Sequence, residues 1–255
     1  METKASMMML VVIACFLSMI TIGIAQNLPT PPSDFSATGS STFNDTNYAL
    51  QTADALAGNI TSLTIHAIGQ TKTWQGYYGN ITATITLDDV NNFTFYNWSA
   101  AEPRGQIYAT LNATVVWNDV VCFDFVNTSA AYYLTMEDYY GVASDDPDGV
   151  NETYTTTGHP SFNVGSRTMT GCPTTYIFQS DTAQTANFPN VLLYDPNNAA
   201  DGWIYTTLLE NSTAGSTNDL LCYNGAECDF QILVNEDGHG TDTATTTYYF
   251  WVEIV

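Results

Sequence analysis

Alternation of apolar and hydroxyl side chains between residues 81 and 87 constrains the fold of this chain more than any other pattern. Ile81, Ala83, Ile85 and Leu87 alternate with threonines at positions 82, 84 and 86. Successive side chains of a β-strand point to opposite faces, so a period of two separates the apolar groups from the hydroxyls. The segment is therefore predicted to form a strand with one apolar face.

Short apolar runs of strand length recur along the chain, and turn-forming clusters such as 145–149 and 211–218 separate them. Lysine, arginine and glutamate, the usual residues of exposed helix faces, are scarce, whereas threonine, asparagine and tyrosine are abundant. These features predict an all-β protein with few helices, folded as an antiparallel β-sandwich of immunoglobulin-like or jelly-roll kind. The further runs expected to form strands are 63–68, 93–98, 106–111, 114–117, 120–126, 174–179, 191–194, 203–209, 228–234 and 245–254.

Two segments carry more specific expectations. A short Ala- and Leu-containing stretch at 48–57 is expected to form one helix, ended by Gly58. The last strand places four large apolar side chains on one face, which predicts that it is buried inside a sheet. These side chains are Tyr248, Phe250, Val252 and Ile254.

The N-terminal region is read as a targeting segment. Lys4 precedes an apolar stretch at 7–25, and the small residues Gly23 and Ala25 precede a polar, proline-rich sequence. This arrangement is typical of a signal peptide, residues 1–25, cleaved after Ala25. The stretch is also long enough for an uncleaved membrane anchor, and Lys4-Ala5 resembles an archaeal prepilin site, so both alternatives stay open.

The remainder is divided into an arm and a folded domain. Residues 26–57 contain Pro29, Pro31 and Pro32 and are expected to form an extended arm or linker. Residues 58–255 are expected to form the β-sandwich domain. A split into two subdomains near 141–158 is the alternative.

The charge balance bounds the partners of this protein. The chain carries 26 acidic and 4 basic residues, a formal net charge of −22. Phosphate binding needs clustered lysine and arginine, so nucleic acid is excluded as a partner.

Four cysteines follow the predicted signal peptide, as expected for two disulfides in an exported chain. Cys222 and Cys228 flank the turn-forming pair Asn224-Gly225, which favours a bridge between them. Cys122 and Cys172 are then paired by elimination. Zinc is the competing interpretation of four cysteines, but the sequence has no Cys-x-x-Cys pair.

Asn-x-Ser/Thr sequons are about twice as frequent as the composition of the chain predicts. Their density in an exported chain indicates covalent N-glycans on exposed asparagines. The alternative is coincidence in a chain rich in asparagine and threonine. The nine asparagines are Asn44, Asn59, Asn80, Asn92, Asn97, Asn112, Asn127, Asn151 and Asn211.

Catalytic motifs find little support in this sequence, so the protein is predicted not to be an enzyme. Its three histidines are isolated, and no nucleophile elbow, His-Glu-x-x-His or phosphate loop occurs. The adjacent acids Glu137 and Asp138 would suit a glycosidase only if they faced another carboxylate across a cleft. Five tryptophans, at 74, 98, 117, 203 and 251, offer a sugar-stacking platform, although core packing is favoured.

One cofactor is considered. Asp146, Asp148 and Asn151 place oxygen ligands at alternate positions around a glycine turn, resembling part of a calcium-binding EF-hand loop. The resemblance fails at the first ligand position, Ser144, and at the twelfth, Thr155. No cofactor and a plain turn are therefore favoured over calcium.

Four stretches together span most of residues 60–255: 71–89 (Thr-Lys-Thr-Trp-Gln-Gly-Tyr-Tyr-Gly-Asn-Ile-Thr-Ala-Thr-Ile-Thr-Leu-Asp-Asp), His159-Pro-Ser-Phe, Cys172-Pro and 229–239. In these stretches the chain resembles a family of exported archaeal surface proteins. The resemblance implies an immunoglobulin-like surface fold and, because this family has no established activity, no catalytic residue. More distantly, the architecture is similar to that of β-sandwich subunits of extracellular filaments that polymerise by donating an N-terminal strand.

The resulting functional hypothesis is a secreted, N-glycosylated structural subunit of an extracellular filament or cell-surface coat. Residues 26–57 are expected to add a β-strand to a neighbouring copy, with Phe35, Phe43 and Tyr48 as anchors. The alternative is an arm that folds back onto its own domain. The alternative functions are a monomeric adhesin or glycan-binding module, a membrane-tethered surface protein and a glycosidase.

Overall fold

Antiparallel β-strands make up most of the regular structure in the computed structural model, which describes residues 28–42, 51–100, 104–125, 133–198, 200–209, 220–236 and 244–254. The helices in these ranges are short: η2 (Trp117–Asp119), α2 (Tyr133–Tyr139) and α3 (Val150–Thr153). The predicted all-β, antiparallel, sandwich-like fold is therefore confirmed. The strands are β1 (Trp74–Gly79), β2 (Ala83–Asp88), β3 (Thr94–Ala100), β4 (Gly105–Thr110), β5 (Val121–Cys122), β6 (Phe162–Val164), β7 (Arg167–Met169), β8 (Thr174–Tyr176), β9 (Pro189–Tyr194), β10 (Trp203–Leu208), β11 (Phe230–Asn235) and β12 (Tyr249–Ile254).

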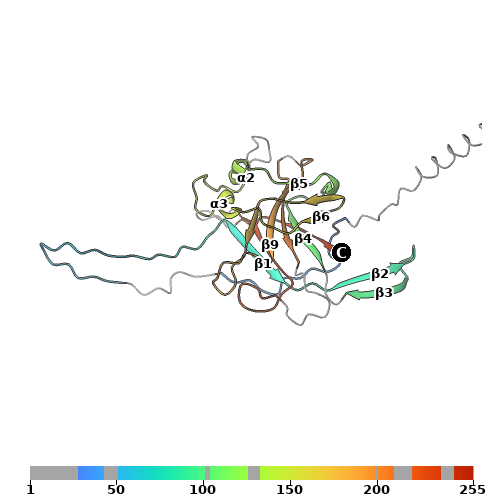
Figure 1. Ribbon diagram of the computed structural model, residues 1–255, viewed down its shortest axis with the longest axis horizontal. Coiled ribbons are helices and arrows are strands. Elements are labelled where there is room, and N and C mark those ends of the chain that lie inside the picture. The colour runs from blue at the N-terminus through green and yellow to red at the C-terminus, as the bar shows by residue number, and fades with distance from the viewer. Residues whose placement is uncertain are drawn as a thin grey trace, which may run out of the picture.

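A six-stranded sheet forms the centre of the body, in the order β12-β4-β10-β9-β5 with β8 also paired to β9 (Figure 1). Every residue of β4 and β9 is buried, and in β10 only Leu208 is half-buried. Adjacent residues of one strand enter different apolar clusters, Tyr205 on one face of the sheet and Ile204 on the other. Both faces of the central strands are therefore covered, which explains why their sequences do not alternate between apolar and polar residues.

Two layers cover this sheet. On one face, Ile232 of β11 and Met136 of α2 pack with the first cluster, and β11 pairs with β1 from the distant N-terminal half. On the other face, Phe162 of the β6–β7 hairpin and Trp117 of η2 pack with the second cluster. The arrangement is a sandwich in which the six-stranded sheet is the middle layer.

The β2–β3 hairpin lies outside this body and extends away from it (Figure 1). It contains the strand that the sequence predicts most clearly, but its apolar face is not buried as a core face would be. Ala83 is buried, whereas Ile85 and Leu87 are 49% and 50% exposed. Asp89 closes the turn by accepting backbone hydrogen bonds from Asn91 and Phe93 at 2.8 and 2.9 Å.

Strand β12 is the edge of the six-stranded sheet and not an interior strand, which corrects the prediction for the last segment. The face that carries Phe250, Val252 and Ile254 is only half-buried, and the buried residue of the strand is Glu253. Backbone bonds from Thr30 cap the open edge at Val252. A strand with one free edge keeps part of its surface in water because no further strand covers it.

Three other local predictions are wrong. The described part of the expected helix, 51–57, is not helical, and neither 63–68 nor 114–117 forms a strand. Residues 114–117 lead into the 3-10 helix η2 instead. Each segment contains the expected apolar residues. In the described structure, however, 63–68 and 114–117 pair with no strand, and 51–57 packs no helical face against the core.

Candidate assembly surfaces and acidic loop

The disulfide between Cys122 and Cys172 joins two strand ends that share a neighbour. Their Cα atoms lie 4.9 Å apart, and this is the pairing that the sequence favours. Cys122 ends β5 and Cys172 shortly precedes β8, and both of these short strands pair with β9. The bridge therefore holds two separate short strands against the central sheet.

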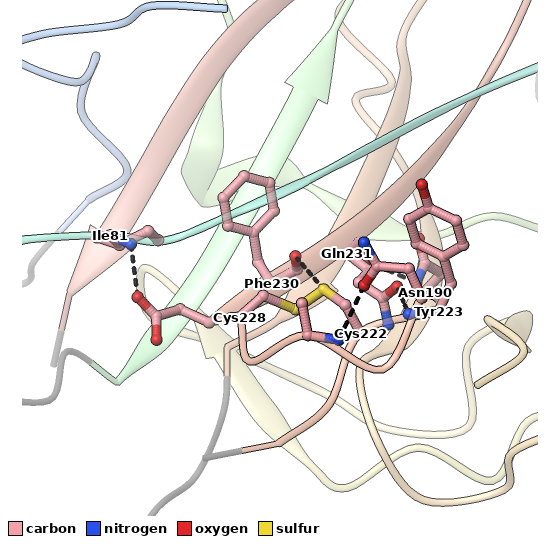
Figure 2. Close-up of a disulfide and its surroundings, with 10 residues drawn as sticks. Ile81, Asn190, Cys222, Tyr223, Cys228, Phe230 and Gln231 are labelled. Carbon is pink, nitrogen blue, oxygen red and sulfur yellow. Dashed lines mark hydrogen bonds between the residues drawn. A yellow bond between two sulfur atoms is a disulfide. The ribbon is translucent and has the colours of Figure 1, made fainter. Parts of the chain in front are cut away.

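A second disulfide, between Cys222 and Cys228, closes a small loop against β11 (Figure 2). Its Cα atoms are 5.8 Å apart. Inside the loop, Gly225 N–H donates to the Cys222 carbonyl at 2.9 Å, as the predicted turn requires. Tyr223 N–H donates to Gln231 Oε1 at 2.7 Å, which anchors the loop on the neighbouring strand. Both expected pairings are present.

Five of the six described sequon asparagines have the exposure that an N-glycan requires: Asn59, Asn80, Asn92, Asn97 and Asn151. The exception is Asn112, which is half-buried at the end of β4. Its Nδ2 atom, the atom that carries an N-glycan, donates to the carbonyl and the carboxylate of Asp201 at 3.1 and 2.6 Å. Asn44, Asn127 and Asn211 lie outside the described residues.

The described part of the predicted arm lies on its own domain. Thr30 and Val252 exchange two backbone hydrogen bonds of 2.9 and 2.8 Å. Phe35 stacks on Phe250, with ring centroids 5.1 Å apart. Within the single chain, this part of the arm has the fold-back arrangement, which is the alternative to strand donation. The other two predicted anchors, Phe43 and Tyr48, lie outside the described residues.

A different segment, residues 51–72, has the features expected of a donated strand. All of its residues are exposed, and it forms neither helix nor strand. It runs far out from the body and back toward the start of β1 (Figure 1). No aspartate, glutamate, lysine or arginine occurs between Asp54 and Lys72. Its large exposed apolar side chains are Leu56, Ile60, Leu63, Ile65 and Ile68, which are 55% to 102% exposed.

The β2–β3 hairpin carries the second exposed apolar surface. Ile85 pairs with Trp98 and Leu87 with Tyr96 across the two strands, so these four side chains share one face. The Tyr96 and Trp98 rings lie 4.7 Å apart, and each side chain is about half exposed. Nothing in the described part of the chain covers this face.

The tryptophans divide between core and surface. Trp203 and Trp117 are buried in the two clusters, and Trp74 and Trp251 pack partly buried against them. Trp98 is 50% exposed on the hairpin. Core packing therefore accounts for four of the five tryptophans, and Trp98 is the one placed to contact a ligand.

The three predicted calcium ligands make hydrogen bonds to different parts of the chain. Asp146 Oδ2 accepts from the backbone N–H of Ala143 at 3.0 Å. Asp148 Oδ2 accepts from a hydroxyl in the segment before β1. Asn151 Nδ2 donates to Glu152 Oε1 at 3.4 Å. Within the described ranges, no three His, Cys, Asp or Glu side chains come together in a metal-binding group.

The most unusual carboxylate at this loop is Glu137 of α2, which the sequence offered only as a candidate glycosidase acid. Glu137 is 1% exposed and accepts a hydrogen bond from Val150 N–H at 3.1 Å through Oε1. Its Oε2 atom is buried without a hydrogen-bond partner in the described structure. Burial, more than any other influence, raises the pKa of Glu137, although the Val150 N–H opposes the shift. The signal in the sequence is an acid close to two large apolar side chains that become core residues, Met136 on α2 and Tyr140 directly after it.

Comparisons with known proteins place no relative beside this chain. No protein-family model, curated protein or solved structure matches it. The resemblance to exported archaeal proteins therefore stays a prediction. No helix within the described residues has the length and apolar character needed to cross a membrane. The apolar stretch 7–25 lies outside those residues.

Proposed function

We propose that this protein is a secreted, N-glycosylated structural subunit that assembles with copies of itself into an extracellular filament or coat. The observation that carries the proposal is the presence of two exposed apolar extensions, residues 51–72 and the β2–β3 hairpin, on one compact body. Apolar surfaces of this kind mark interaction sites when the same chain leaves them uncovered. Residues 51–72 form an extended segment that pairs with no strand, and the β2–β3 hairpin is a two-stranded sheet that can accept a third strand.

The segment 51–72 is suited to strand addition. Leu63, Ile65 and Ala67 alternate with the more polar residues at 62, 64 and 66, so in an extended conformation the segment has one apolar face. Strand addition gives affinity through backbone hydrogen bonds and specificity through alternate side chains. The absence of acidic residues at 55–71 removes one source of repulsion between two copies of a chain that carries a net charge of −22.

The β2–β3 hairpin is suited to receive such a strand. A two-stranded sheet is only marginally stable in water, and a third strand provides the stability that it lacks. The hairpin and the segment 51–72 extend on different sides of the body (Figure 1). A contact between two different surfaces of one chain is head-to-tail, and it builds open filaments when the rotation does not close.

Several features support an extracellular setting. Two disulfides are typical of oxidising compartments. Five exposed sequon asparagines are accessible for glycan attachment. The predicted signal peptide at 1–25 supplies the export route.

The proposal is tested by removing the apolar side chains of the segment while leaving its length unchanged. The triple variant Leu63→Ser, Ile65→Ser, Ile68→Ser should remain monomeric in sedimentation velocity and electron microscopy, under conditions where the wild-type protein polymerises. Its melting temperature as a monomer should match that of the wild type, because these side chains are exposed in the single chain.

The control changes the hydroxyl side chains that alternate with Leu63 and Ile65 in the same segment. Ser62→Thr with Thr64→Ser keeps both hydroxyl groups and should still polymerise. A wild-type protein that stays monomeric at high concentration contradicts the proposal, as does unchanged assembly of the triple variant.

A second candidate function, a glycan-binding surface module, is favoured by the adjacent exposed rings of Tyr96 and Trp98. Exposed aromatic rings can stack on sugar faces. Trp98→Ala should then abolish binding to a glycan array while Trp251→Ala, a half-buried control, leaves it unchanged. Absence of glycan binding by the wild-type protein removes this candidate.

A further inference from the structure

The two edges of the six-stranded sheet differ in what they offer to another chain. One edge is formed by β5 and β8, which are only two and three residues long. The other edge is β12, a strand of six residues with the sequence Tyr-Phe-Trp-Val-Glu-Ile. A short edge strand presents few backbone groups to a partner, whereas a longer apolar edge strand is a template for association. The β12 edge is therefore the one at which uncontrolled pairing is expected.

The composition of β12 favours such pairing. Short segments with high β-propensity, little charge and no proline are those that assemble edge to edge. Glu253 is the only charged residue between 249 and 254. Its side chain is buried, and its carboxylate accepts a hydrogen bond from Tyr108 OH at 2.8 Å. No exposed charge on β12 therefore opposes the approach of a second strand.

Residues 28–35 of the arm lie on this edge of their own chain. Thr30 and Val252 form the only bridge between the arm and β12 in the described residues, with backbone hydrogen bonds of 2.9 and 2.8 Å. Beside it Pro29 is buried, and the ring of Phe35 stacks on Phe250. The arm is therefore held on β12 by a few contacts and not by a continuous ladder.

The prolines around Thr30 stop the pairing from extending. Successive N–H groups of an extended strand point to opposite sides, so the N–H of Thr30 faces β12 while positions 29 and 31 face away from it. Both of those positions are proline, which has no N–H to offer a further strand. Continuing the antiparallel register would place Pro32 opposite Phe250, where it also cannot donate. The arm thus covers β12 without becoming a new edge.

We propose that residues 28–35 are an edge guard, which prevents β12 from pairing with β12 of a second copy. Two identical strands pair antiparallel across a two-fold axis, the commonest symmetry of protein dimers. Antiparallel is also the direction in which β12 already accepts Thr30. Without the guard, the same backbone groups of Val252 pair with the second copy, and two six-stranded sheets become one.

The edge guard does not rest on the proposed filament, because neither 51–72 nor the β2–β3 hairpin takes part in it. The test keeps the two proposals apart by using Leu63→Ser, Ile65→Ser, Ile68→Ser as the background. With the guard intact, this background should be monomeric in sedimentation velocity. An assembly that persists here without slowing hydrogen–deuterium exchange at 249–254 contradicts the filament proposal alone.

Two added substitutions release the guard. Thr30→Pro removes the N–H that bonds to Val252, and Phe35→Ala removes the ring stacked on Phe250. Both side chains are exposed, so the fold should be kept. The released protein should form a dimer whose dissociation constant is at least about tenfold lower than that of the guarded protein, because each of the two copies loses a competing backbone hydrogen bond. Exchange at 249–254 should slow as the dimer forms.

The control changes the same residue types at exposed positions away from β12. Thr38→Pro with Phe178→Ala, in the same background, should stay monomeric. Phe35→Ala alone leaves the backbone bridge in place and should give an intermediate dissociation constant. A released protein that stays monomeric overturns the proposal. So does a dimer with unchanged exchange at 249–254, which would use another surface, and so does equal dimerisation of the guarded and released proteins.

Discussion

The central strands and the β2–β3 hairpin illustrate opposite relations between sequence pattern and burial. Strand β2 has the most regular apolar alternation in the chain, but two of its three apolar side chains are half exposed. Strand β9 has almost no alternation, and all of its residues are buried. Alternation therefore identifies a strand, while the number of layers packed on the sheet decides how many of its faces leave water.

The largest expected difference between the two regions is in the free energy of unfolding. Trp203→Ala removes a fully buried side chain from β10 and should destabilise the protein by roughly 3–5 kcal/mol. Trp98→Ala in β3 should cost less than about 1 kcal/mol in the monomer, because half of its surface is already in water. Urea unfolding monitored by circular dichroism measures both. Equal losses would mean that the hairpin is covered in solution.

Loss of the Cys122–Cys172 bridge should have the next largest effect. The double variant Cys122→Ser, Cys172→Ser should lose about 3 kcal/mol, since this bridge closes a 50-residue separation and pins two strands to β9. The variant Cys222→Ser, Cys228→Ser removes a bridge across a separation of only 6 residues and should lose about 2 kcal/mol less. Thermal unfolding of both variants without reductant tests the order. The reverse order would contradict the assignment of the larger constraint to the central sheet.

A smaller contrast is expected between two sequon asparagines. Asn112→Gln at the end of β4 should cost about 1 kcal/mol in unglycosylated protein, because it disturbs two hydrogen bonds to Asp201. Asn97→Gln on the exposed hairpin should have no measurable effect. Peptide mapping of native material should find lower glycan occupancy at Asn112 than at Asn97. Equal occupancy would show that Asn112 is modified before its partner is in place.

The smallest effect is a pH dependence of opposite sign in the two regions. Burial raises the pKa of Glu253 above its usual 4.5, although hydrogen bonds from Tyr108 and Gly165 oppose the shift. Its contribution to stability is therefore present below about pH 4.5 and lost as the pH rises through the folded-state pKa. In the hairpin, hydrogen bonds from Thr86 and Thr94 lower the pKa of Asp88 below 3.8, so that contribution is lost as the pH falls.

Substitution of each acid isolates these contributions. The stability of Glu253→Gln relative to the wild type should increase as the pH rises from strongly acidic to neutral. The stability of Asp88→Asn relative to the wild type should decrease slightly over the same range. Urea unfolding at several pH values measures both trends. If the relative stability of Glu253→Gln instead decreases as the pH rises, as expected for Asp88→Asn, then burial does not raise the pKa of Glu253.

Local features could be predicted from sequence because their physical causes are local. Asn224-Gly225 favours a tight turn, and a separation of 6 residues brings Cys222 and Cys228 together without help from the rest of the fold. Period-two patterns and scarce lysine, arginine and glutamate were sufficient for the all-β class. The pairing of Cys122 with Cys172 followed only by elimination.

The candidate sites depended on contacts that sequence does not contain. The arm folds onto β12 because Thr30 finds the free backbone groups of an edge strand, and nothing in the local sequence identifies that edge. Residues 51–72, which include part of the helix expected at 48–57 and the strand expected at 63–68, are left as an exposed extension because no described helix or strand packs against them. Neither outcome could be read from periodicity.

The sequence by itself determined that this chain forms short antiparallel strands, closes a tight disulfide loop and carries an acidic, sequon-rich surface. These properties arise from backbone preferences and composition, which act within a few residues. Only the tertiary structure decided which apolar faces are buried, which strand became an edge, and that the side chain of Glu137 is buried. Those outcomes depend on which distant segments displace water from a surface, and that competition is resolved only when the whole chain is packed.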